Sequence, residues 1–184
     1  MLDLGHRYTN SIPADGILPD HAAASYWFRR AAFTAEVGCD TWIKANFLLA
    51  SDFDKPAESR RILRMIAKEC KKDQVSLAKV EYFFILLCIR EGNLEAAERH
   101  TLTVMNWHND PKKKPSDISE KGKIDVQRLT AGGAMMDAWS TVPWPKVERK
   151  EKVKQFMDRY SLTGGSLQRD GERALKNIEN SQDP

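Results

Sequence analysis

The 184-residue chain has few cysteines, no long hydrophobic run and no apparent leader. Its three cysteines are an odd number at wide spacing and include no Cys-x-x-Cys pair, which argues against a disulfide framework and a structural zinc site. No apolar stretch is long enough to span a bilayer, and Met1 is not followed by the basic start and apolar core of a signal peptide. We therefore expect reduced thiols, no membrane insertion and a cytoplasmic protein.

The motifs of common catalytic sites are also missing. There is no glycine-rich phosphate loop, His-Glu-x-x-His pair, Gly-x-Ser-x-Gly elbow or acidic calcium loop. The four histidines are not at metal-ligand spacing, and acidic residues alternate with basic ones rather than forming an isolated acid and base pair. We expect no enzyme, metal or cofactor. An enzyme with a non-motif site remains an alternative, tested by replacing His100, His108 or Cys88.

What the chain does contain is helical periodicity. With 41% hydrophobic and 30% charged residues it suits one domain or one short solenoid with a core. Ala24, Trp27, Phe28 and Ala31 lie at i, i+3, i+4 and i+7, which predicts a helix with one buried stripe. Asp20 stands where it can cap that helix through its side-chain oxygen.

More helices are expected after this one. A helix capped by Asp40 should end in the polar residues 51–56, and residues 58–72 keep the helical period. Residues 76–89 are apolar on almost every side, which predicts a fully buried helix. Glu91-Gly92-Asn93 then predicts a turn and a return helix from Leu94. The spacing from the start of one hairpin to the start of the next is close to the roughly 34 residues of tetratricopeptide-type repeats, or slightly more.

The C-terminal part is less regular. Residues 109–117 form a polar Lys/Pro loop, which we expect to separate repeats at 1–108 from divergent helices at 118–184. The first of these, residues 118–139, contains Gly132-Gly133, a pair that indicates close packing or a bend. A charged helix over 146–160 and a weakly apolar, loosely docked helix over 167–179 should follow. The apolar positions expected in the first and second of these helices are Ile124, Leu129, Met135, Met136, Trp139, Val153, Phe156, Met157 and Tyr160.

The first hairpin resembles a known family. Its pattern is similar to the Sel-one-like repeat, a relative of the tetratricopeptide repeat with the signature Leu-Gly-x-x-Tyr, Gly-Val-x-x-Asp, Lys-Ala-x-x-Trp-Tyr-x-Lys-Ala-Ala. Outright matches are Leu4, Gly5, Tyr8, Gly16, Asp20, Ala24, Trp27, Ala31 and Ala32, and conservative replacements are Ile17, Phe28 and Arg30. The turn departs from the signature, with Ser11 at an expected glycine and Pro13 inserted.

This resemblance implies an all-α, short right-handed solenoid of antiparallel helical hairpins with an irregular C-terminal helical cap. Proteins built from such repeats, many of them bacterial, mostly act as adaptors, assembly factors or regulators. Because a repeat helix normally begins about a turn before such a Leu-Gly pair, an upstream leader, anchor or further repeats are also expected from the resemblance. Removal of a leader would make the protein periplasmic.

The function expected is therefore protein binding without catalysis. We expect an adaptor or regulatory scaffold that holds a partner protein or peptide in a solenoid groove. Two alternatives are an immunity or anti-defence inhibitor that occludes an enzyme or toxin, and a nucleic-acid-binding helical protein. The net charge of +3 is mild, and acidic residues interrupt the best basic run, so an acidic protein partner fits these charges at least as well as nucleic acid does. The sequence does not predict an oligomeric state.

The candidate partner-binding residues are basic or aromatic, since tryptophan and arginine often anchor interfaces. For Trp107, Trp139 and Trp144, a core position and a surface anchor are both open. The proposed surface is a groove between the repeat helices and the C-terminal part. Its lining is Arg60, Arg61, Arg64, Trp144, Lys146 and Arg149.

Overall fold

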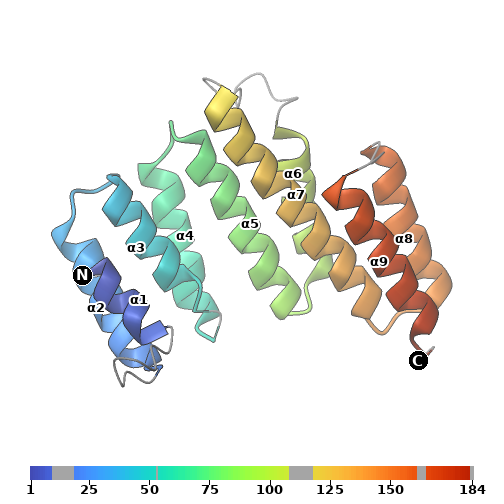
Figure 1. The fold of residues 1–184 in the computed structure, drawn as a ribbon, viewed down its shortest axis with the longest axis horizontal. Helices are drawn as coiled ribbons and strands as arrows, with labels where there is room; N and C mark the ends of the chain where they lie inside the picture. Colours follow the sequence, from blue (N-terminus) through green and yellow to red (C-terminus); the bar gives the residue numbers. More distant parts are fainter. Residues whose placement is uncertain (10–18, 53, 108–117, 161–164, 183–184) are drawn as a thin grey trace. The chain divides into compact units, whose positions relative to one another are not determined.

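The computed structural model describes residues 1–9, 19–52, 54–107, 118–160 and 165–182, and within them every regular element is a helix. The prediction of an all-α protein is confirmed (Figure 1). The helices are α1 (Leu2–Thr9), α2 (His21–Thr34), α3 (Asp40–Ala50), α4 (Pro56–Glu69), α5 (Gln74–Arg90), α6 (Leu94–Met105), α7 (Ile118–Thr141), α8 (Lys146–Arg159) and α9 (Ser166–Asn180). The predicted turn at Gly16 and Ile17, the loop at 109–117 and His108 lie outside the described residues.

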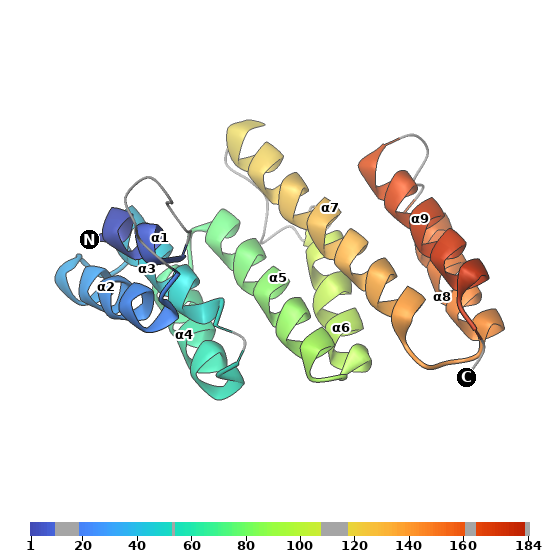
Figure 2. The same ribbon diagram turned by 60° about the horizontal axis from the view of Figure 1, so that its bottom comes forward.

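The chain divides into two compact units, Met1–Phe83 and Phe84–Pro184, here called unit 1 and unit 2. The division falls within α5, whose helix is continuous (Figures 1 and 2). No residue from 74 to 89 is exposed, but most of them are half-buried, so the prediction of a fully buried helix is confirmed only in part. Partial or full burial around the whole helix agrees with a sequence that leaves almost no polar face.

In unit 1 each helix packs on its neighbour in sequence, α1 on α2, α2 on α3 and α3 on α4. The predicted stripe of α2 is inside, with Ala24, Phe28 and Ala31 at most 3% exposed and Trp27 half-buried. Asp20 caps α2 as expected, because its side chain accepts a hydrogen bond of 2.9 Å from the Ala23 amide.

The start of α3 differs from the prediction. Asp40 is the first helical residue, and Cys39 is the N-cap, with its Sγ accepting from the Trp42 amide at 3.5 Å. Cys39 has extended backbone angles, φ −74° and ψ 162°, so the helix begins one residue earlier than an aspartate cap at position 40 would require. α4 begins at Pro56. Proline has no amide hydrogen to donate, and at the first position of a helix that group has no partner within the helix, so no hydrogen bond is lost.

Unit 2 begins with the second half of α5 and the predicted turn. Gly92 has φ +73°, a left-handed conformation that glycine adopts easily, and the Asn93 side chain caps α6 by accepting from the Ala96 amide at 3.1 Å. α7 packs against α6, α8 and α9. Of the three open tryptophans, Trp107 and Trp139 are buried at 2% and 1% exposure, and Trp144 is half-buried.

The glycine pair of α7 reflects close packing. A Cβ added at Gly132 would lie 2.8 Å from Leu167 Cδ1, and one added at Gly133 would lie 2.9 Å from Asp170 Oδ2, both on α9. α9 is therefore not loosely docked, and that prediction is wrong. Its inner face is nearly or fully buried, and an ion pair of 3.0 Å joins Arg173 to Asp137 of α7. The inner-face residues are Leu167, Gly171, Ala174 and Ile178.

One predicted core position of α7 is on the surface. Leu129 is 42% exposed, whereas Ile124 and Met135 are fully buried. A step of five residues along an α-helix is a rotation of about 140°, so Leu129 lies on another face than Ile124.

No described helix combines the length and apolar character needed to cross a membrane.

Candidate functional site

The six predicted partner-binding residues belong to different units. On α4 of unit 1, Arg61 and Arg64 are exposed and Arg60 is half-buried. In unit 2, Trp144 and Lys146 are half-buried around the start of α8. Each group is therefore a candidate surface of its own unit.

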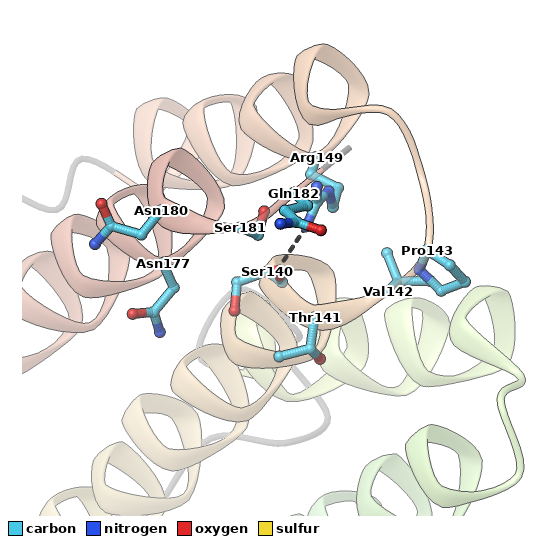
Figure 3. A pocket seen from close by; sticks show the side chains of 9 residues that line it. All are labelled: Ser140, Thr141, Val142, Pro143, Arg149, Asn177, Asn180, Ser181 and Gln182. Atoms are coloured by element: carbon cyan, nitrogen blue, oxygen red, sulfur yellow. Dashed lines mark hydrogen bonds between the residues drawn. The ribbon is translucent and has the colours of Figure 1, made fainter. Parts of the chain in front are cut away.

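Arg149 differs from the other five because it is only 3% exposed. Its guanidinium Nη1 donates a hydrogen bond of 3.0 Å to the carbonyl oxygen of Ser140, which lies in the last turn of α7 (Figure 3). A cation near the C-terminal carbonyls of a helix stabilises that end. The exposed charge expected at position 149 is thus replaced by a buried one that holds α8 against the end of α7.

A pocket of about 660 Å³ lies beside this contact (Figure 3). It brings together the α7–α8 connection and the C-terminal end of α9. Amide and hydroxyl side chains predominate in its lining. The lining residues are Ser140, Thr141, Val142, Pro143, Arg149, Asn177, Asn180, Ser181 and Gln182.

The hydroxyl groups of this pocket are not arranged for nucleophilic chemistry. Ser140 Oγ donates to the Asp137 carbonyl at 2.8 Å, and Ser181 Oγ donates to the Ile178 carbonyl at 2.8 Å. An activated hydroxyl instead donates to a general base, such as a histidine. The hydrogen bonds of these two side chains stabilise their own helix ends.

A second candidate surface, which the sequence alone did not predict, is the outer face of α2. Tyr26 is 55% exposed and Phe33 is 90% exposed, and Val37 just beyond the helix is 60% exposed. Arg30 lies between them, with Nη1 3.4 Å from the Tyr26 hydroxyl and its guanidinium carbon 5.7 Å from the Trp27 ring centroid. At about 100° per residue, Tyr26, Arg30 and Phe33 lie opposite the buried stripe. Tyr26, Arg30, Phe33 and Val37 are together called the α2 face.

A third site is an apolar pocket of about 240 Å³ in unit 1, here called the Lys79 pocket. It combines aromatic and aliphatic walls with two lysines and a histidine. The Lys79 ammonium lies 4.5 Å from the centroid of the Phe47 ring and 6.0 Å from that of Phe83. The lining residues are Leu2, His6, Lys44, Phe47, Leu48, Ser51, Lys79 and Phe83.

The environment of Lys79 disfavours its positive charge. Burial lowers the pKa of Lys79 below the ordinary value of 10.5, and the neighbouring charge of Lys44 lowers it further. We expect an NMR titration of the lysine side chains to give a Lys79 pKa below 10.5. Replacing Lys44 with glutamine should raise that pKa part of the way, because burial is the larger cause.

This shift has a defined effect on stability. Between the lowered pKa and 10.5 the unfolded chain binds more protons at this position than the folded chain does, so stability should rise with pH across that window. The Lys79→Met variant should lose this part of the pH dependence, measured by chemical denaturation at several pH values. Lys68→Gln is the control, since the Lys68 side chain is 76% exposed on α4, and an equal response to it would contradict the assignment.

The cysteines are free, and Cys70 and Cys88 are buried as predicted. The pKa of the Cys70 thiol is raised, first by burial and then by the charges of Asp73 and Glu69. Since the thiolate is the nucleophilic form, this environment lowers the reactivity of Cys70. Among the described residues no three histidine, cysteine or acidic side chains are grouped so that they could hold a metal ion.

The sequence contains a signal for the α2 face but little for the pockets. Tyr26 and Phe33 are large apolar residues outside the stripe that α2 buries, and such residues are worth testing as contacts. The residues of the Lys79 pocket come from three helices between positions 2 and 83, and no local sequence pattern brings them together.

Comparisons of the chain with protein-family models, with curated proteins and with solved structures find no match.

Proposed function

We propose that this chain is a non-catalytic helical-repeat protein that binds a partner protein through the α2 face. The observation that carries the proposal is the exposure of Tyr26 and Phe33, with Arg30 between them, on one side of a regular helix. Exposed apolar side chains gathered on one face mark interaction sites, and tyrosine and arginine are frequent among residues that dominate binding energy. An adaptor or regulatory scaffold is the class of protein that this surface serves.

Features of the first hairpin support a Sel-one-like repeat within this proposal. Gly5 of α1 lies against the Phe28 ring of α2, so a glycine is required where the two helices meet. Asp20 caps α2, and Ala24 and Ala31 are buried at 2% exposure. A short right-handed solenoid of such hairpins would leave one helix face of each hairpin available for a partner.

The test compares two variants with the wild type in affinity capture from the source lysate. Phe33→Asp places a charge in the centre of the α2 face, and Val147→Asp places the same charge at an 80% exposed position of α8. A partner protein should be retained by the wild type and by Val147→Asp, and its retention by Phe33→Asp should fall about 30-fold, the effect of losing a 2 kcal/mol anchor. Circular dichroism should show both variants to be folded.

Three results would contradict the proposal. Equal retention of the partner by all three proteins would exclude the α2 face, and retention of no protein would remove the binding role. Recovery of nucleic acid that is lost steeply as salt rises would favour the nucleic-acid alternative. A captured enzyme whose activity falls on binding would instead identify the inhibitor form of protein binding.

A further inference from the structure

The Lys79 pocket is distinct from the α2 face, because none of its lining residues belongs to α2. It is built by the start of α1, by α3 and by α5. Phe47 is 3% exposed and its ring lies 5.3 Å from that of Phe83, so the aromatic wall is fixed by packing. Such a preformed wall is what small-molecule sites use to enclose a ligand.

The charges around this wall have one sign. Lys44 and Lys79 and the weakly basic His6 line the pocket, and its described lining includes no aspartate or glutamate. Within the described residues, no carboxylate lies in ion-pair distance of Lys44 or Lys79. The Lys79 ammonium is instead held over the faces of Phe47 and Phe83, a cation–π contact that replaces little of its lost hydration.

An anion in the pocket would supply the missing counter-charge. An opposite charge within a few ångströms favours the ammonium form of a buried lysine, which reverses the effect of burial on its pKa. The described lining contains no arginine, whose planar fork is the preferred partner of phosphate. A monoanion with an apolar body therefore complements the pocket better than a phosphate group does.

The size of the pocket limits the body of such a ligand. Its volume is about 240 Å³, and one water occupies about 30 Å³ in the liquid, so the space suits roughly eight to ten non-hydrogen atoms. Leu2, Leu48 and the two phenylalanine rings would bury the apolar body. We propose that the Lys79 pocket is a binding site for a small amphipathic carboxylate, whose carboxyl group pairs with Lys79 and Lys44.

The experiment uses octanoate as the probe and the full chain as the protein. Titration followed by amide NMR should show saturable shifts that concentrate at residues of the Lys79 pocket, with a Kd on the order of 1 mM for a ligand of about ten non-hydrogen atoms. Octanol, which has the same chain without the charge, and acetate, which has the charge without the chain, should each bind at least about tenfold more weakly.

Three variants test the role of the ammonium. Lys79→Met keeps the volume and removes the charge, so octanoate binding should weaken at least about tenfold, the usual effect of losing a charge-assisted hydrogen bond. Lys79→Arg should retain most of the affinity, and Lys68→Met, at an exposed position of α4, should change it less than twofold. Removing a half-buried charge should not unfold the protein, and thermal melts would check this.

The proposal is overturned if octanol binds wild type as tightly as octanoate, since the lysines then contribute nothing. It is also overturned if acetate binds as tightly, if Lys79→Met leaves the affinity unchanged, or if the shifts lie outside the pocket. Phe33→Asp should bind octanoate like the wild type, and Lys79→Met should still capture the partner protein. The failure of either proposal can therefore be recognised separately.

Discussion

Replacing Trp139 with alanine is expected to lower the free energy of unfolding of unit 2 by about 3–5 kcal/mol, the usual range for removing a buried tryptophan or phenylalanine. Trp139 is 1% exposed on α7, and its ring meets the Phe156 ring of α8 edge-on, with centroids 5.6 Å apart. The Lys152 ammonium lies 5.9 Å from the Trp139 ring centroid and forms an ion pair of 3.1 Å with Glu98. The indole thus joins α7 to α8.

Lost packing rather than a lost hydrogen bond should account for the lower free energy of unfolding of Trp139→Ala. Trp139 Nε1 has no hydrogen-bond partner among the described residues, so the N–H group contributes no protein contact there. Trp139→Phe removes this group and keeps an aromatic ring, and should cost clearly less than Trp139→Ala. Denaturant unfolding followed by far-ultraviolet circular dichroism, with hydrogen exchange to locate the change in unit 2, measures both effects.

Trp144→Ala is the matched control in the same unit. Trp144 is half-buried in the α7–α8 connection, so its removal should cost much less than the removal of Trp139. Equal losses at the two positions would contradict the account, as would a Trp139→Ala variant as stable as the wild type. If Trp144→Ala weakened partner capture without loss of stability, the sequence-based prediction of a binding role at Trp144 would gain support.

Local signals in the sequence predicted much of the fold. The cap at Asp20 and the turn at Gly92 depend on residues within three or four positions, so the sequence displays them directly. The helix at 76–89 was also recognisable, because its sequence is apolar on almost every side. The glycine pair in α7 predicted close packing or a bend, and it did not identify α9 as the neighbour.

The features that the sequence did not predict, the tight packing of α9 and the burial of Arg149, depend on tertiary packing. The four inner residues of α9 lie at i, i+4, i+7 and i+11, but two of them are Gly171 and Ala174, and small residues give a weak apolar signal. Glycine at 171 allows a close approach to Met157, which makes the interface tight rather than loose. Burial of Arg149 likewise depends on where α7 ends, which a charge pattern does not reveal.

The candidate sites were harder still to predict. Helical periodicity identifies the face of α2 that is buried, but not whether the opposite face is covered by another element, so the exposure of Phe33 required the structure. The Lys79 pocket depends on Lys44 and Lys79, which lie on different helices and are linked by no pattern in the sequence. The pocket arises from the packing of α1 and α3 with α5.

Replacing Gly5 with valine is expected to destabilise unit 1 by about 1–3 kcal/mol, because it overpacks the contact between α1 and α2. Even one carbon added at Gly5 would clash with three atoms of the Phe28 ring, and that ring is 3% exposed. Phe28 also meets the His6 ring edge-on at 5.5 Å, so it has little room to move. Denaturant unfolding and hydrogen exchange in α1 and α2 measure the effect.

Gly122→Val separates the clash from the backbone effect. Gly122 is also helical, but a side chain there meets no described atom within 4 Å, so replacing this glycine should be neutral or slightly stabilising. Phe28→Leu should cost stability in the wild type but less in the Gly5→Val background, because the smaller side chain relieves the clash. If Gly5→Val were as harmless as Gly122→Val, the close contact of the first hairpin would not be real, and the support it gives to a Sel-one-like repeat would be lost.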